Sequence, residues 1–192
     1  MVRILQIIGL ILLGGCSLFA TREPEPPGSG GTSVFKQPDR PDVVIENLVS
    51  AVSGMNTFNY IRCLSGDTFR FTPTSTAQQT YPDVFTRWNA DSEDLWFSTM
   101  SAAARQTSGH TLVISDLREE SLSATERRFI GDYALTVYHN RASQGVPNLV
   151  RGRFIMTLVS ADNGLWSIRE WTDISVAAGP SWSDLKALFT RS

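Results

Sequence analysis

The stretch Val150–Ser175, VRGRFIMTLVSADNGLWSIREWTDIS, decides the fold, because it reads as two strands joined by a tight turn. In the first strand Phe154, Met156 and Leu158 share one face and polar residues alternate with them, as in a half-buried strand. The second strand alternates in the same way. Between them Asp162–Gly164 has the side chains of a turn that tolerates positive φ. We therefore predict an antiparallel hairpin.

The apolar faces also predict the register, because a one-residue slip would send each apolar set to the wrong side. We expect Val159 opposite Leu165, which places Glu170 beside Phe154 on the apolar face. An unpaired carboxylate is unusual there, so Glu170 is the first candidate for a pocket residue. A bulge in the second strand would instead turn Glu170 to solvent. On the other face this register sets Arg153 opposite Trp171 and Arg151 opposite Asp173.

The first residues have the pattern of a targeting segment. Arg3 precedes an apolar run, Ile4–Leu13, which is followed by Gly14-Gly15-Cys16. This run is too short to cross a hydrocarbon core of roughly 30 Å, which takes about 20 residues. The pattern resembles bacterial lipoprotein signal peptides, in which the cysteine is lipidated and becomes the new N-terminus. We expect a signal peptide over 1–15 and lipidation at Cys16; the alternative is a stray apolar stretch followed by an unmodified cysteine.

That resemblance implies a membrane-anchored envelope protein. A diacylglycerol-modified and palmitoylated cysteine carries several acyl chains, and each buried CH₂ contributes roughly 0.8 kcal/mol, so the anchor is stable. In the resembling lipoproteins of two-membrane bacteria an Asp after the cysteine tends to retain the protein at the inner membrane. Ser17 stands there, so we expect the periplasmic face of the outer membrane if the organism has one.

A flexible linker and one domain follow. Residues 16–40 alternate prolines and glycines with polar residues, a composition that buries no core and that spans on the order of 25 to 30 Å. Residues 41–192 suffice for one domain with a core. The formal net charge of −2 and the absence of a Lys/Arg cluster argue against nucleic acid as a partner.

The remaining reactive side chains form no recognised motif. With Cys16 lipidated, Cys63 is alone in an apolar helical context, which favours a buried and inert thiol. The two histidines, His110 and His139, belong to no metal or hydrolase motif. We therefore expect no metal site and no cofactor.

Periodicity and capping residues predict the other elements. Helices should begin near Pro41, Asn56, Asn89 and Ser181, and 74–83 should be a loop. Strands should cover 69–72, 112–117 and 127–139, with a bulge or bend at Gly131. In the helix near Asn89, the acids Asp91, Glu93 and Asp94 should stabilise the first turn. This order predicts an α+β domain in which a curved antiparallel sheet wraps the N-terminal helices, with a short C-terminal helix.

Roughly Pro41–Ser175 resembles the nuclear transport factor 2-like superfamily, the cone-shaped fold shared with ketosteroid isomerases and polyketide cyclases. The features that carry the resemblance are Val44–Leu48, Tyr60–Leu64, Phe69–Phe71, the aromatic helix after Trp88, and Trp166–Trp171. The ending also resembles a group of small bacterial lipoproteins of unknown function. All of these are patterns of packing, so they imply the fold and not an activity.

Enzymes of the resembling superfamily place carboxylates, Tyr or His inside the cone, which gives three candidate pocket-lining residues here: Glu170, Tyr133 and His139. Tyr133 and His139 alternate with core residues, and such residues are more often satisfied core groups than ligand contacts. Asp132 points to the opposite face, where solvent is expected. No catalytic residue is carried over from the family.

Three functions remain open. The first is a non-catalytic module that binds a small apolar ligand or an envelope protein through the cone or the outer sheet face. The second is an isomerase-like or hydrolase-like enzyme with Glu170 and Tyr133 in its pocket. The third is a structural envelope protein that self-associates through the sheet, for instance as a homodimer. A cone filled by side chains would exclude both ligand binding and catalysis in its interior.

Overall fold

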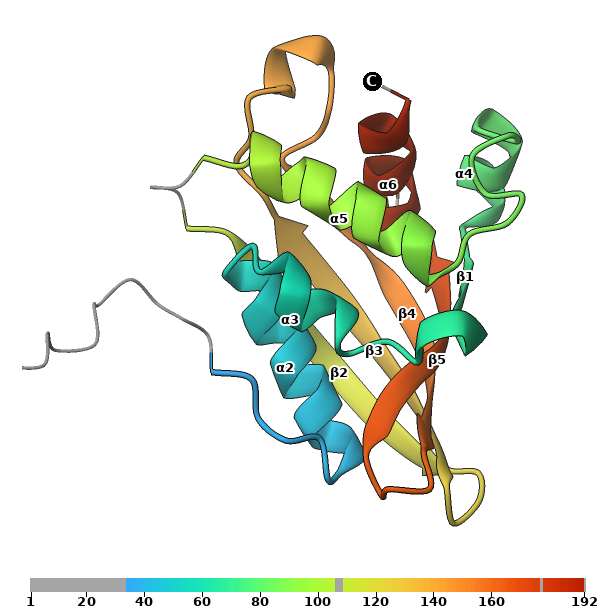
Figure 1. Cartoon of the computed structure of the whole chain (residues 1–192). Coiled ribbons are helices and arrows are strands. Elements are labelled where there is room, and N and C mark those ends of the chain that lie inside the picture. Colours follow the sequence, from blue (N-terminus) through green and yellow to red (C-terminus); the bar gives the residue numbers. More distant parts are fainter. Residues whose placement is uncertain (1–33, 106–108, 177, 192) are drawn as a thin grey trace, which may run out of the picture. The chain divides into compact units, whose positions relative to one another are not determined.

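Five strands form one curved sheet, and the longer helices lie on its concave side (Figure 1). The computed structural model describes residues 34–105, 109–176 and 178–191. The predicted lipidation site, Cys16, lies outside these residues. The α+β fold class predicted from the sequence is confirmed.

The strand order is β1-β5-β4-β3-β2. Strands β2 to β5 pair antiparallel in sequence order, and the short β1 pairs parallel to β5 at the edge. The strands are β1 (Arg70–Thr72), β2 (Thr111–Ser121), β3 (Glu126–Thr136), β4 (Leu149–Ser160) and β5 (Trp166–Ile174).

The helices begin close to the predicted caps. They are α2 (Pro41–Ser53), α3 (Thr57–Ile61), α4 (Ser75–Thr80), α5 (Ala90–Ala103) and α6 (Trp182–Thr190). The prediction of a loop over 74–83 is wrong, because α4 lies there. Thr74 caps this helix by accepting a hydrogen bond from the Ala77 N–H, and the Ala77 side chain is buried.

Bulges in β2 and β5 bend the sheet. In β2 the pairing with β3 shifts between Ser115 and Arg118, and Asp116 adopts a φ of 51°. The bulge lies opposite Gly131, where a Cβ atom would stand only 2.9 Å from the Phe154 ring. A side chain at position 131 would therefore have to displace Phe154. The irregularity expected at Gly131 lies in the facing strand β2, whereas β3 pairs regularly with β4 through this glycine.

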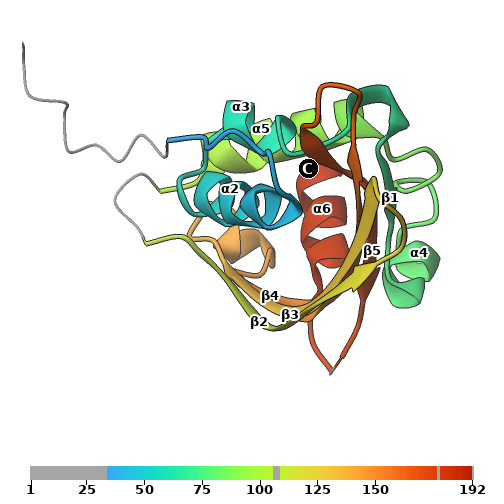
Figure 2. The ribbon, with the colours of Figure 1, turned by 90° about the horizontal axis from the view of Figure 1, so that it is seen from below.

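Helix α6 fills the concave side of the sheet. Figure 2 shows it beside α2, within the curve formed by the strands. Its N-terminus is fixed by a capping box in which Ser181 and Asp184 bond each other's backbone N–H groups. The side chains of Trp182, Leu185 and Phe189 are each 1% exposed. The C-terminal helix is thus part of the core.

The segment before α2 is tied to the domain. The Lys36 backbone exchanges two hydrogen bonds with the Asn47 side chain, at 2.9 and 2.7 Å. The Trp166 N–H donates to the Pro38 carbonyl at 2.8 Å. No helix within the described part of the chain is both long enough and apolar enough to cross a membrane.

Candidate functional site

The predicted register of the β4–β5 hairpin is wrong. Val159 pairs with Ser167 instead of Leu165, a shift of two residues that keeps the apolar faces together. Farther along, the pairing shifts once more because Arg169 has no partner on β4. This bulge reverses the alternation of side chains for the rest of β5.

The bulge turns Asp173 inward and Glu170 outward. Asp173 is 2% exposed and pairs with Phe154, in the place predicted for Glu170. The Glu170 side chain is 56% exposed and its nearest cation is Arg169, at 3.6 Å. Glu170 therefore does not face the core, and the carboxylate that does was not among the predicted candidates.

The outer face carries the pair formed by Arg153 and Asp132. Arg153 donates two hydrogen bonds to the Asp132 carboxylate, at 2.6 and 3.0 Å. This bonding lowers the pKa of Asp132 below its ordinary value. Asp132 faces away from the core, as predicted. The predicted placements of Arg153 opposite Trp171 and of Arg151 opposite Asp173 are wrong, because the bulge turns both β5 residues inward.

Hydrogen bonds from β3 and from the start of α6 hold Asp173. The Tyr133 hydroxyl donates to Asp173 Oδ1 at 2.7 Å, and the Ser183 N–H and hydroxyl donate to Oδ2 at 2.8 and 2.6 Å. The Trp182 N–H donates to the Tyr133 oxygen at 2.7 Å. This first network joins α6 to the sheet.

A glycine on β4 makes room for Tyr133. Gly152 pairs with Tyr133, and a Cβ atom at Gly152 would lie 2.5 Å from the Tyr133 hydroxyl. Burial raises the pKa of Asp173 above its ordinary value. Burial and the nearby Asp173 charge raise the pKa of Tyr133. The Tyr133 proton therefore stays on its oxygen and donates to Asp173.

A second network surrounds Glu93, from the first turn of α5. Trp88 Nε1–H donates to Glu93 Oε1 and the Tyr60 hydroxyl donates to Oε2, each at 2.8 Å. Lys186, from α6, donates to both oxygens. The Glu93 and Lys186 side chains are each 0% exposed. Glu93 lies in the first turn of α5, as predicted, and its buried carboxylate is also a partner of α6.

Four aromatic rings enclose the Lys186 ammonium. Its nitrogen lies 4.2 Å from the Trp96 ring centroid and 4.3 Å from that of Phe71, with Trp88 and Trp171 at 5.3 and 5.4 Å. Burial lowers the pKa of Lys186 to about 8, against the opposing effect of the Glu93 charge. Burial and Glu93 raise the pKa of Tyr60. Cation–π contacts and the carboxylate together replace the solvation that the ammonium loses.

These two networks engage the interior carboxylates with donors of the domain itself. Both oxygens of Glu93 and both oxygens of Asp173 accept hydrogen bonds from protein donors. A general acid or base must reach the proton that it transfers, either directly or through one water. Among the described residues, the donors that meet these carboxylates are side chains and backbone groups of the same domain. Their arrangement serves to fasten α6.

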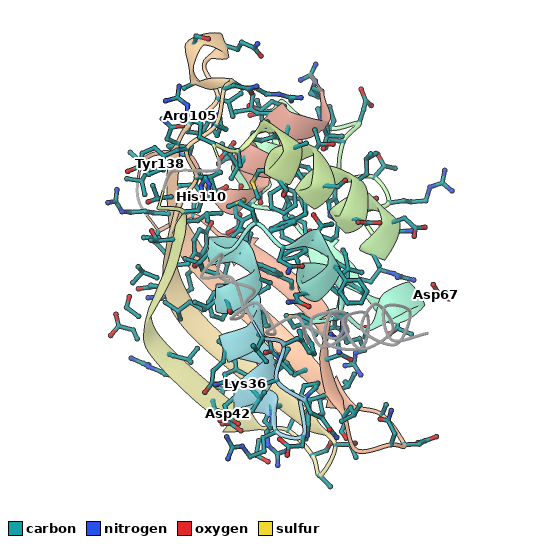
Figure 3. The ribbon with its side chains drawn as sticks, turned by 60° about the vertical axis from the view of Figure 1, so that its left-hand side comes forward. Lys36, Asp42, Asp67, Arg105, His110 and Tyr138 are labelled. Carbon is teal, nitrogen blue, oxygen red and sulfur yellow. The ribbon has the colours of Figure 1, made fainter. Side chains whose placement is uncertain are left out.

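The histidines and the free cysteine are satisfied locally. His139 bonds the Pro147 carbonyl and accepts from the Arg141 N–H, each at 3.2 Å. Burial lowers the pKa of His139. His110 lies with Arg105 and Tyr138, well apart from Asp67 (Figure 3). Cys63 donates to the Asn59 carbonyl, and burial raises the pKa of its thiol to about 12. The prediction that this cysteine is buried is confirmed.

Of the three predicted pocket residues, only Tyr133 belongs to one of the two networks, in which it bonds Asp173. The sequence patterns did not identify the buried charged residues of the networks, which are Asp173, Glu93 and Lys186. A signal for two of them was present. Glu93 precedes the buried residues Trp96, Phe97 and Met100 at the spacing of one helix face, and Lys186 lies in the same way among Trp182, Leu185 and Phe189. Within residues 34–105, 109–176 and 178–191, no three His, Cys, Asp or Glu side chains are placed to hold a metal ion.

A hollow of about 620 Å³ lies at the sheet edge. It is formed between β1 and the segment 85–89 that precedes α5, and the Phe71 N–H joins the two sides by donating to the Trp88 carbonyl at 3.5 Å. We call it the β1 groove. Its walls consist of Asp67, Arg70, Phe71, Thr72, Phe85, Thr86, Arg87, Trp88 and Asn89.

Comparison with known proteins supports the fold alone. No protein-family model matches the sequence, and no curated protein matches it. A putative scytalone dehydratase from Novosphingobium aromaticivorans is similar in structure, with a TM-score of 0.54, 13% identity, and coverage of 73% of this chain and 89% of that one. A nuclear transport factor 2-like protein from Salmonella enterica has a TM-score of 0.52 and 11% identity, and the match covers 71% of this chain and 89% of that one. A putative calcium/calmodulin-dependent protein kinase II association domain from Xanthomonas campestris has a TM-score of 0.53 and 14% identity, and the match covers 72% of this chain and 86% of that one. The domain therefore has the nuclear transport factor 2-like fold.

Proposed function

We propose that this chain is a non-catalytic interaction module of the bacterial cell envelope, held at a membrane by lipid on Cys16. The observation that supports a non-catalytic role is the Lys186–Glu93 pair. It places a cation from the chain's own C-terminal helix against a carboxylate at the centre of the cone, where both side chains are 0% exposed. A substrate in that position would have to displace α6. The module therefore acts through its surface.

An enzyme of the isomerase or hydrolase type is the second candidate. Two carboxylates and two tyrosines are gathered in the interior, and one structurally similar protein is described as a putative scytalone dehydratase. Another is described as a putative association domain, so the fold serves both catalysis and assembly. Burial and full hydrogen bonding of the four groups favour the non-catalytic role here.

The membrane part of the proposal rests on the sequence. Leu13-Gly14-Gly15-Cys16 follows a short apolar run, and Ser17 stands in place of the Asp that tends to retain such proteins at the inner membrane. The tether would then hold the domain at the periplasmic face of the outer membrane. Self-association of tethered domains through the outer sheet face is a further form that this module can take.

Fatty-acid labelling of expressing bacteria tests the anchor. We expect label and membrane association in the wild-type chain, and loss of both in Cys16→Ser. Cys63→Ser is the matched control, because Cys63 is the other cysteine of the chain and its thiol is buried against Asn59. That variant should keep both label and membrane association. Label that persists in Cys16→Ser would overturn the proposed anchor.

A further inference from the structure

The β1 groove has a rigid aromatic floor. The Phe71, Phe85 and Trp88 rings pack with centroids 5.1 to 6.1 Å apart. Each of these residues is mostly buried, with 6%, 6% and 4% exposed, so only an edge of the cluster faces the groove. The bond from Trp88 Nε1–H to Glu93 fixes the indole orientation. A preformed apolar floor receives a ligand with little loss of conformational entropy.

Two arginines stand at this floor without an acidic partner. Other arginines of the described ranges form ion pairs with acidic side chains. Within the same ranges, neither Arg70 nor Arg87 forms one. The Arg70 guanidinium is oriented by donating to the carbonyls of Asp67 and Phe69, at 2.7 and 2.6 Å, which leaves its other nitrogens available. Asp67 is the acidic residue of the wall, so the wall has a formal charge of +1 from two arginines and one aspartate.

The remaining wall groups add hydrogen-bonding capacity. Thr72 and Thr86 bring hydroxyls, and Asn89 brings a side-chain amide at the start of α5. A hollow of about 620 Å³ falls within the range of roughly 300 to 1,000 Å³ that small-molecule sites occupy. Unpaired guanidinium groups above an apolar floor complement an anion with an apolar body.

We infer that the β1 groove is a binding site for a small organic anion, a carboxylate carried on a flat apolar group. The apolar group lies against the Phe71–Phe85–Trp88 floor, and the carboxylate accepts hydrogen bonds from Arg87 and Arg70. The inference rests on the proposed role as a binding module and names the class of ligand. It does not depend on the lipid anchor, so failed labelling of Cys16 would leave it standing.

The test uses 2-naphthoate as the anionic probe and the neutral 2-naphthamide as its match. Each is titrated into the isotope-labelled full chain while the tryptophan indole N–H signals are followed by NMR. The variant is Arg87→Gln, which removes one guanidinium that bonds no part of the fold. The control is Arg118→Gln, an exposed arginine on β2 at the opposite edge of the sheet.

We expect 2-naphthoate to shift the Trp88 signal in a saturable way. The affinity for 2-naphthamide should be at least about threefold lower. Arg87→Gln should lower the affinity for 2-naphthoate by a similar factor, because one exposed charge contact is lost, and should leave the affinity for 2-naphthamide unchanged. Arg118→Gln should bind both probes like the wild type. Equal affinity of the two probes, equal affinity of wild type and Arg87→Gln for naphthoate, or shifts confined to other indoles would overturn the site. If the site fails this test while Cys16 is labelled normally, the proposed ligand class is wrong and the proposal of a lipid-anchored module still stands.

Discussion

Asp173 and Glu170 show how much one backbone irregularity decides for single residues. They lie three positions apart on β5 and so face opposite sides of the sheet, and the bulge at Arg169 determines that Asp173 is the buried one. Asp173→Asn should lower the free energy of unfolding by about 1.5 to 3 kcal/mol, because the amide replaces a carboxylate that accepts three hydrogen bonds. Glu170→Gln should change it by less than about 0.5 kcal/mol. Urea unfolding of both variants measures the difference; equal losses would contradict the observed register.

His139 should make the domain sensitive to acid. Its folded-state pKa is lowered by burial, so the unfolded chain takes up the proton first as the pH falls. The stabilisation by neutral His139 is complete above the unfolded value of about 6.5 and is lost progressively below it. Protonation would also remove the acceptor that the Arg141 N–H uses.

The measurement is the free energy of unfolding of wild type and His139→Gln between about pH 5 and pH 7. Wild type should lose stability more steeply toward low pH than the variant, whatever their difference at neutral pH. Parallel slopes would show that His139 takes up its proton equally well in the folded and unfolded chains.

The alternation of β3 predicted that Tyr133 faces the interior, but it did not indicate the partners of Tyr133. The predicted face of Asp173 is wrong because regular alternation does not continue through the bulge at Arg169, and the residue types around this bulge do not reveal it. Glu93 and Lys186 were overlooked because charged side chains are ordinarily exposed. Their helical spacing with buried residues indicated otherwise, but neither helix alone reveals that the other supplies the opposite charge.

The β5 bulge is the element on which the interior depends. Deletion of Thr172, which follows the bulge, would reverse the alternation beyond Trp171, turning Asp173 to solvent and Ile174 inward. We expect this variant not to fold, as seen by circular dichroism and by loss of a cooperative transition. A glycine inserted after Asp162, in the β4–β5 loop, should be tolerated because loop lengthening costs little. A folded deletion variant would contradict the pairing of β4 with β5.

At the scale of elements, periodicity predicted the hairpin and the positions of the longer helices. It did so because packing of an apolar face dominates their formation. Helix α4 was missed since its six residues are polar apart from Ala77, and one buried alanine gives no periodic signal. The parallel pairing of β1 with β5 is a long-range contact that local sequence does not encode.

At the scale of the whole molecule, the proposed non-catalytic role rests on the filling of the cone by buried side chains. The fold could be predicted because its strands and helices carry matching apolar faces. The closed interior could not, because it arises from contacts between α6 and residues some 90 to 110 positions earlier, such as those of Lys186 with Glu93 and of Ser183 with Thr74. Sequence spacing gives no measure of such contacts.

Reactivity of the two lysines tests the closed interior most directly. The chain has only Lys36, with a 65% exposed side chain, and Lys186, with a 0% exposed one, so each protein sample contains its own control. The full chain is treated with an acetylating reagent at increasing denaturant, digested and analysed by mass spectrometry. The closed cone predicts rapid acetylation of Lys36 throughout, and acetylation of Lys186 only at the midpoint of global unfolding. Acetylation of Lys186 in native buffer at a rate near that of Lys36 would show that α6 leaves the cone and would contradict the non-catalytic account.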